Sequence, residues 1–174
     1  MPLEVELKFI VTDFSETREA LEEAGAWVVH ELAYEKNVVL DTIDGELRKE
    51  GKLLRVRKYG DAVFITIKEP VQSGPMKKRI ENELKIKKTF SEAQAIFGKT
   101  GCFPVYTYEK TREIWCCSGS HVCLDTLYFG MFVEIEAQSE EKVAATAVLL
   151  GFDPADGLRE SYRTLEKRYK YSNS

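Results

Sequence analysis

The sequence of 174 residues lacks several features that would settle its function at once. It has no glycine-rich Walker loop and no apolar run approaching the ~18 residues that span a membrane. Its two histidines, His30 and His121, lie far apart and form no recognisable pair of nucleophile and base. These absences argue against a P-loop nucleotide site, a membrane partner and a hydrolytic triad.

The four cysteines contain no Cys-x-x-Cys pair, so neither a zinc site nor a redox motif is expected. They are Cys102, Cys116, Cys117 and Cys123. Ordinary thiols of this kind, together with an opening segment that resembles a strand and not a signal peptide, predict a cytoplasmic protein. A net charge of −4 makes nucleic acid an unlikely partner.

Charged residues, which make up 31% of the chain, are abundant and regularly spaced. The opening stretch LEVELKF alternates without a break. In a β-strand its apolar residues would share one face, while Glu4, Glu6 and Lys8 would share the other. One strand of this kind indicates only a polar outer face on a sheet.

A unit of strand, helix and glycine recurs along the chain. Glu6-Leu7-Lys8-Phe9 and Glu83-Leu84-Lys85-Ile86 are each followed by such a helix, and a looser third copy follows Glu134-Ile135-Glu136. The predicted N-caps are Ser15, Ser91 and Ser139, and the predicted left-handed helix ends are Gly25, Gly101 and Gly151. Tyr34-Glu35-Lys36 and Tyr108-Glu109-Lys110 also correspond. A fourth helix is predicted from about Leu158 to Tyr169.

Two hairpins and one loop complete the expected elements. Residues 53–59 and 62–68 should pair across Gly60-Asp61, and residues 111–117 and 121–125 across Ser118-Gly119-Ser120. Residues 69–77 contain two prolines and a glycine and predict a mobile loop. Because no linker divides the chain, a single domain over residues 1–174 is expected.

The alternation of charged and apolar faces returns in most predicted strands. The charged faces hold Arg55 and Arg57, Thr66 and Lys68, Arg79, Glu81 and Glu83, Lys110 and Arg112, Asp125, and Glu134 and Glu136. Helices follow three of these strands and must cover an apolar face, so the charged faces should point inward. The predicted fold is therefore α+β: a closed antiparallel β-barrel that forms a charged tunnel, with helices packed outside.

A charged interior is costly unless its groups are paired, hydrated or bound to a ligand. Converging carboxylates suit Mg²⁺ or Mn²⁺, which prefer oxygen ligands. Arginine and lysine side chains suit phosphate oxygens. The pattern therefore predicts a small-molecule polyphosphate with its divalent metal.

The pattern Glu4-x-Glu6-x-Lys8 resembles the signature of the CYTH superfamily, the triphosphate tunnel metalloenzymes, which include class IV adenylate cyclases, thiamine triphosphatases and inorganic triphosphatases. Further matching stretches cover nearly the whole chain: LLRVRK, ITIK, RIENE, YEKTR, Asp125, GMFVEIE and Ser161-Tyr162. EVELKF, YTYEKTREI and SYRTL look similar to the small bacterial class IV cyclases.

The resemblance implies a barrel of about eight strands. It implies metal binding by Glu4, Glu6, Glu134 and Glu136, with Asp125, Glu81 and Glu83 nearby. It implies a triphosphate held by Lys8, Arg55, Arg57, Lys68, Arg79, Lys110 and Arg112. The residues predicted to act in catalysis are Lys8, Glu6 and Glu136.

Three functions remain open at this level, besides a barrel with a purely structural role. The favoured one is metal-dependent hydrolysis of the terminal phosphate of a triphosphate, whether inorganic triphosphate, thiamine triphosphate or a nucleoside triphosphate. The alternative is conversion of ATP to cyclic AMP and pyrophosphate, for which Tyr34, Phe64 and Tyr108 are the aromatic candidates to stack on a purine. The third is a module that binds polyphosphate without turnover. The oligomeric state stays open, a homodimer included.

Overall fold

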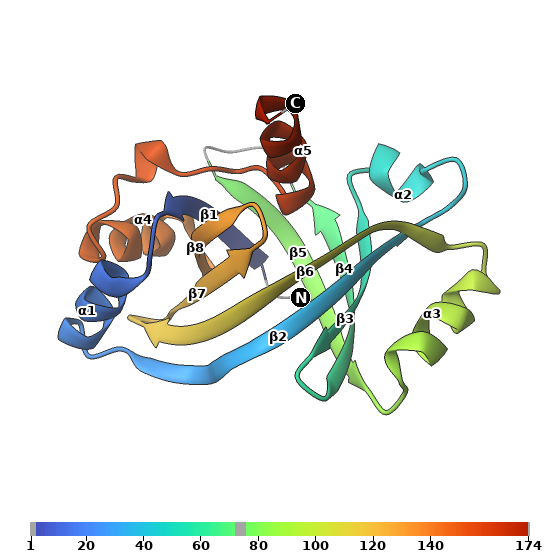
Figure 1. Cartoon of the computed structure of the whole chain (residues 1–174), viewed down its shortest axis with the longest axis horizontal. Helices are drawn as coiled ribbons and strands as arrows, with labels where there is room; N and C mark the ends of the chain where they lie inside the picture. The colour runs from blue at the N-terminus through green and yellow to red at the C-terminus, as the bar shows by residue number, and fades with distance from the viewer. Residues whose placement is uncertain (1–2, 72–75, 174) are drawn as a thin grey trace.

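Eight antiparallel strands close into a barrel in the order β1-β5-β4-β3-β2-β6-β7-β8, in a computed structural model that describes residues 3–71 and 76–173 (Figure 1). The strands are β1 (Leu3–Val11), β2 (Trp27–Asp41), β3 (Leu53–Tyr59), β4 (Ala62–Pro70), β5 (Lys77–Ile86), β6 (Phe103–Cys117), β7 (Ser120–Leu127) and β8 (Gly130–Ala137). The predicted closed barrel with outer helices is confirmed.

Helices lie outside the barrel, as Figure 1 shows. They are α1 (Ser15–Glu23), α2 (Glu46–Lys49), α3 (Phe90–Gly98), α4 (Glu140–Leu149) and α5 (Tyr162–Ser172), with a short 3₁₀ turn at Pro154–Asp156. The main core lies between α1, α4 and the outer face of β1, β7 and β8. There Leu21 and Val143 pack against the apolar residues of the strands, Leu7 and Ile135 among them.

Strand register places the charges inside. Glu6 is opposite Glu136 and Lys8 is opposite Glu134 between β1 and β8. Residues directly opposite one another in a sheet point to the same face, so both pairs project into the barrel. Because Leu7 between them is buried under the helices, the opening alternation separates an apolar outer face from a charged inner one.

Helix ends follow the sequence with two corrections. Gly25, Gly101 and Gly151 have φ of 68°, 84° and 82°, the left-handed conformation predicted for helix ends. Ser139 caps α4 by accepting the backbone N–H of Lys142, as predicted. The N-caps predicted at Ser15 and Ser91 are wrong.

At α1 the N-cap is Phe14, which forms no side-chain cap. At α3 the cap is Thr89, which accepts the N–H of Glu92 while Glu92 accepts the N–H of Thr89. This reciprocal capping box satisfies two backbone donors at once, whereas Ser91 would have satisfied one.

The last helix begins later than predicted. Leu158 does not start a helix, because its backbone exchanges hydrogen bonds with that of Lys8 at 3.0 and 2.8 Å. Helix α5 begins at Tyr162, where Ser161 accepts the N–H of Thr164. The chain segment between α4 and α5 therefore adds a short bridge to β1.

The segment predicted as a mobile loop, residues 69–77, is partly strand. Strand β4 continues to Pro70 and β5 begins at Lys77. Residues 72–75 lie outside the described part of the chain. The described helices include none that is both long and apolar enough to cross a membrane.

The correspondence of Tyr34-Glu35-Lys36 with Tyr108-Glu109-Lys110 does not extend to facing. Glu35 is opposite Lys110 in the register of β2 and β6, and both are buried inside the barrel. Tyr34 is half exposed on the outside. Side chains alternate between the two faces of a strand. The two triplets are therefore out of step by one residue, and a position that points inward in one triplet points outward in the other.

Candidate active site in the barrel interior

The barrel encloses a cavity of about 610 Å³. Its walls carry charged side chains from almost every strand and from α5. Most of the predicted site residues line it directly: Glu6, Lys8, Arg55, Arg57, Lys68, Arg79, Glu81, Glu83, Lys110, Arg112, Glu134 and Glu136. The predicted residues thus meet in one place although they span most of the chain.

Glu6 on β1 is a carboxylate paired with three cations of this interior. Its Oε1 accepts from Lys8 Nζ at 2.6 Å and from Lys77 Nζ at 2.5 Å. Its Oε2 accepts from Arg79 at 3.3 Å. Burial opposes its ionisation, yet these three cations hold the pKa of Glu6 well below its usual value.

Glu4 lies two residues away, with its carboxyl in hydrogen-bonding reach of those of Glu6 and Glu81. Lys68 on β4 donates to both oxygens of Glu4 at 2.6 and 2.7 Å, and it also pairs with Glu81. Burial raises the pKa of Glu4 to about 10 against the opposing effect of Lys68. The carboxyl groups of Glu4 and Glu81 therefore share one lysine, which leaves a local excess of negative charge.

Glu136 adds to the same excess of negative charge. Burial and the neighbouring carboxylate of Glu134 raise the pKa of Glu136. Its cation contact is weak, since Arg112 is 3.7 Å away. Lys8 does not relieve it, because Lys8 is held between Glu6 at 2.6 Å and Glu134 at 2.7 Å.

Asp125 on β7 lies in a second cluster, at the foot of α5. Arg112 donates to both of its oxygens at 2.6 Å, in a bidentate pair. Lys110 donates to it at 3.0 Å and the Tyr162 hydroxyl at 2.6 Å. Arg112 also reaches Glu134 at 2.5 Å, which joins this cluster to the first.

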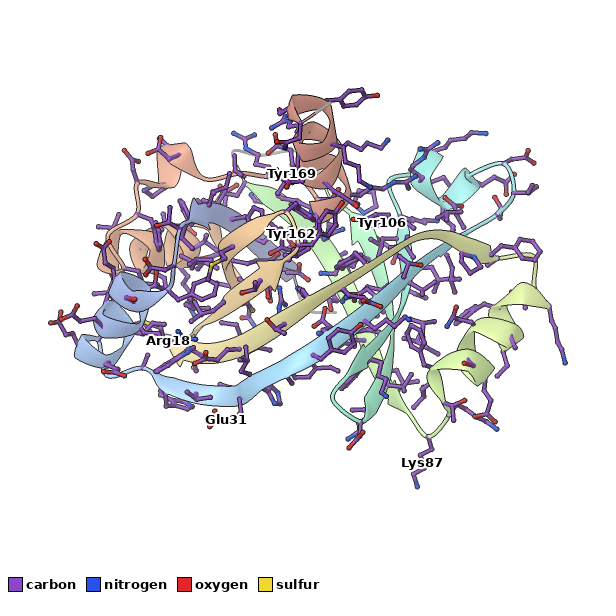
Figure 2. The ribbon with its side chains drawn as sticks, viewed as in Figure 1. Arg18, Glu31, Lys87, Tyr106, Tyr162 and Tyr169 are labelled. Atoms are coloured by element: carbon purple, nitrogen blue, oxygen red, sulfur yellow. The ribbon has the colours of Figure 1, made fainter. Side chains whose placement is uncertain are left out.

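Tyr162 connects α5 to the interior. In Figure 2 it lies with Tyr106 where α5 meets the barrel. The ammonium groups of Lys8 and Lys110 stand 5.3 and 5.1 Å from its ring centroid, within the range of cation–π attraction. The family resemblance included Tyr162, but its bond to Asp125 was not predicted.

A third cluster centres on Glu35, which sequence analysis did not select. Glu35 is fully buried and accepts from Asn37 at 2.8 Å and from Arg57 at 3.3 Å, with Lys110 at 3.5 Å. Burial opposes its ionisation, but Lys110 and the neighbouring arginines lower its pKa. Arg57 also donates to Glu83 at 2.6 Å.

Signals for the missed residues existed but were weak. Glu35-x-Asn37 has the two-residue spacing of the other inner pairs, but no flanking pattern marked that part of β2 as a strand. Lys77 precedes Arg79 by two residues, but the proline- and glycine-containing segment beside it favoured a loop. Glu35, Asn37 and Lys77 belong to long strands. Only the pairing of those strands with their neighbours reveals that these side chains point into the barrel.

The arginines of β3 and β5 keep unused donors. The Nε groups of Arg55, Arg57 and Arg79 are buried and have no hydrogen-bond partner among residues 3–71 and 76–173. Arg55 has the longest contacts: Thr66 at 3.3 Å, Tyr108 at 3.5 Å and Glu83 at 3.7 Å. A buried donor without a partner is costly, so these groups indicate a place for an anionic ligand.

The carboxylates fit a hard divalent cation in chemistry, since Glu4, Glu6, Glu81 and Glu136 offer only oxygen donors. Within residues 3–71 and 76–173, however, no three acidic, histidine or cysteine side chains converge as they stand to hold a metal ion. The reason is visible in their contacts: Glu4, Glu6 and Glu81 are turned toward lysine and arginine side chains.

Of the aromatic candidates for purine stacking, Tyr34 is excluded by its outward position. Phe64 lies under the Arg57 guanidinium, at 4.9 Å from its ring centroid. Tyr108 lines the cavity and stacks on Tyr106 with centroids 5.3 Å apart. Tyr106 and Tyr108 therefore form an aromatic pair on the cavity wall, beside its arginine and lysine side chains.

Three solved structures with the same fold show the likeness, and the descriptions of two of them name an adenylate or adenylyl cyclase. A proposed adenylate cyclase of Vibrio parahaemolyticus superposes with a TM-score of 0.84 at 23% identity, over 95% of this chain and 98% of that one. A Pyrococcus horikoshii protein superposes with a TM-score of 0.75 at 26% sequence identity, over 95% of this chain and 99% of that one. A proposed adenylyl cyclase of Hippeastrum is described with a dominant triphosphatase activity. It superposes with a TM-score of 0.60 at 16% sequence identity, over 87% of this chain and 85% of that one.

The comparison with curated proteins yields no significant match. A family model does match, and it spans residues 2–162 under the description CYTH domain. That range includes all eight strands and every predicted site residue. Because the match covers far more than half of the chain, and because the barrel and its charged interior agree with it, the chain belongs to the CYTH domain family.

Proposed function

We propose that this protein hydrolyses the terminal phosphate of a triphosphate with the help of a divalent metal. One observation carries the proposal: buried arginines with unused Nε donors face a cluster of carboxylates across a single charged cavity. The cations suit the phosphate oxygens and the excess carboxylates suit a metal ion. Without a ligand, the acidic and basic side chains of such a cavity pair with one another, which agrees with the ion pairs described above.

The metal would be Mg²⁺ or Mn²⁺, held by Glu4, Glu6 and Glu136, with Glu81 and Glu134 beside them. Glu4 and Glu136 are the carboxyl groups whose pKa is raised in the protein alone, so added positive charge favours their ionised form. When bound, the metal supplies charge neutralisation and an activated water. We assign Glu83 and Asp125 a supporting role, because each is bonded to arginine away from this cluster.

The chain's own cations would hold the substrate by exchanging partners. Arg55 and Arg57 would turn their guanidinium groups to phosphate oxygens. Lys8 and Lys68 would exchange their carboxylate partners for phosphate oxygens, which would leave those carboxylates free to bind a metal ion. Lys110, Arg112 and Arg79 complete the set. Positive groups fixed in a low-dielectric interior stabilise the charge that grows on the leaving phosphate.

A second candidate is the cyclisation of ATP, favoured by the stacked pair of Tyr106 and Tyr108 beside the cations. It would use the same groups, but the ribose 3′-hydroxyl would attack the α-phosphorus. That reaction needs the hydroxyl at roughly 3–3.5 Å from the phosphorus, which requires a dedicated site for adenosine. Hydrolysis requires only the phosphate contacts, the metal and a water, so we favour it.

One experiment separates these functions. Purified protein is incubated with Mg²⁺ or Mn²⁺ and with ATP, tripolyphosphate or thiamine triphosphate, and the products are separated by chromatography. We expect orthophosphate release to exceed cyclic AMP formation. Cyclic AMP and pyrophosphate as the main products from ATP, with tripolyphosphate untouched, would establish the cyclase instead.

Tight binding of all three compounds without any product would show a module that binds polyphosphate. Intact carboxylates argue against that outcome, because a pure binder could rely on cations. The cytoplasmic location and a homodimer stay predictions, the former in keeping with the free thiols of all four cysteines.

A further inference from the structure

The cavity has two ends, and they differ in charge. One lies between α2 and α5, which are on the same side of the molecule in Figure 1. We call it the α2–α5 mouth and define it by Arg48, Lys52, Tyr106, Arg163 and Lys167, which all line the cavity.

The opposite mouth is defined by Val29, His30, Ile114 and His121, which also line the cavity. Along β6, Tyr106 and Ile114 are eight residues apart, or about 26 Å at 3.3 Å per residue. The two mouths are therefore separate openings of one tunnel.

The cations of the α2–α5 mouth are not neutralised. Within residues 3–71 and 76–173, Arg48, Arg163 and Lys167 form no ion pair, in contrast to the cations of the interior. Lys52 is the exception, since it pairs with Glu50. Arg163 stands over the Tyr106 ring, with its guanidinium carbon 5.5 Å from the centroid.

Two acids lie at this mouth, and neither offsets these cations. Glu166 accepts from the Tyr106 hydroxyl at 2.8 Å, but its charge is paired with Lys170 at 2.8 Å. Asp41 is buried, and its carboxylate accepts the backbone N–H groups of Thr42, Leu47 and Arg48 at 2.8 to 3.1 Å. Those bonds fix the start of α2 and orient the carboxylate toward the backbone. The mouth therefore presents a local positive charge.

The opposite mouth presents no such charge. Two of its four residues are apolar and two are histidines. The protein as a whole carries a net charge of −4, so an approaching polyanion is repelled on average. An anionic substrate thus meets a favourable potential at one mouth and not at the other.

We propose that the α2–α5 mouth is the port by which the triphosphate enters the tunnel, and that Arg48, Arg163 and Lys167 steer it there. This inference rests on the proposed function, because it presumes an anionic substrate. A cleft lined by one sign of charge focuses the field and raises association rates by roughly 10–10³-fold. The effect falls with salt, since exposed charges are screened over about 10 Å at 0.1 M.

The test compares two charge-reversed pairs that change the net charge equally. The mouth pair is Arg48→Glu with Lys167→Glu. The control pair is Lys58→Glu with Lys87→Glu, two exposed lysines that do not line the cavity. Figure 2 shows Lys87 at the end of the molecule remote from Tyr106 and α5.

Stopped-flow mixing with ribose-labelled fluorescent ATP and Mg²⁺ measures the association rate from low to high ionic strength. We expect the mouth pair to lose about 10-fold or more at low salt, with the loss disappearing near 0.5 M salt, and the control pair to change by about 2-fold or less. The milder pair Arg48→Gln with Lys167→Gln should fall in the same direction, which guards against misfolding of the first.

Two results would overturn the inference alone: equal losses in both pairs, or no loss in the mouth pair, while the wild type still binds. A wild type that binds neither labelled ATP nor, by calorimetry, tripolyphosphate would instead remove the proposed function and this inference with it.

Discussion

Two walls of the tunnel differ in how far their charged side chains are paired within the protein. On the wall formed by β7, β8 and β1, Glu6, Lys8 and Asp125 are almost completely buried and form short bonds to partners. On the wall formed by β3 and β4, Arg55 and Arg57 are partly accessible, and their Nε donors have no partner. On the first wall, which we call the packed wall, Lys8 is paired, and the spare capacity lies in the carboxyl groups of Glu4 and Glu136, whose pKa is raised. The second wall, which we call the open wall, keeps unused arginine donors instead.

The outer faces explain part of this difference. Behind β7, β8 and β1, the helices α1 and α4 cover a continuous apolar core (Figure 1). Behind β3 and the start of β4, helix α3 covers a second core that includes Val56 and Val63. Farther along this side, Ile67 on β4 and Leu84 on β5 are 44% and 65% exposed. The second wall is therefore covered by a helix over only part of its length, and fewer packing contacts oppose side-chain movement in the uncovered part.

The largest effect is expected from Glu6→Gln on the packed wall. Neutral glutamine leaves Lys8, Lys77 and Arg79 short of a counter-charge, at a cost of about 3 kcal/mol in unfolding free energy. It also removes a proposed metal ligand, which should lower turnover by about 100-fold or more. Urea unfolding and orthophosphate release measure the two effects.

The control for Glu6→Gln is Glu22→Gln on the exposed side of α1, which should change neither quantity. Turnover of Glu6→Gln equal to that of the wild type would remove the metal assignment.

Arg57→Ala tests the open wall. Loss of a charge-assisted contact should weaken tripolyphosphate binding by about 1.5–3 kcal/mol, measured by calorimetry with Mg²⁺. Lys58→Ala is the matched control, because Lys58 is the next residue of β3 and is exposed. Equal affinities for Arg57→Ala and Lys58→Ala would contradict a phosphate-binding role for this wall.

Tyr162→Phe probes the connection between α5 and the packed wall. The variant loses the hydroxyl that donates to Asp125 at 2.6 Å but keeps the ring between Phe129 and Phe132. We expect a loss of about 1–2 kcal/mol in unfolding free energy by urea titration. Tyr171→Phe, at an 84% exposed position, should change nothing, and an equal loss in both variants would refute the specific bond.

The smallest effect, of opposite sign, is expected from Glu136→Gln. The pKa of Glu136 is raised on folding by burial and by Glu134, so its ionised form at neutral pH reduces stability. Glutamine removes that penalty, and the melting temperature without metal should rise slightly. If Glu136→Gln instead lost as much stability as Glu6→Gln, the two carboxylates would have the same environment. That result would contradict the difference between their cation contacts described above.

Much of the barrel could be predicted because the strand period is two. Once Leu54 and Val56 are assigned to the apolar face, Arg55 and Arg57 must point the other way, and the same holds for Glu134 and Glu136. Helix ends were predictable where one residue type is strongly favoured, as at the left-handed Gly25. Capping at Ser91 was not, because Thr89 and Glu92 form a capping box that starts the helix at Phe90 and places Ser91 inside its first turn.

The amino-acid order therefore specifies which side chains face the tunnel, because alternation along a strand is a local property of the backbone. It does not specify which cation meets which carboxylate, because that depends on the pairing register and on the closure of the barrel. Lys68 meets Glu4 across 64 residues of chain, and Glu35 enters the interior only through its pairing with β3 and β6. The difference between a wall with spare carboxyl groups and one with spare arginine donors arises from those long-range contacts.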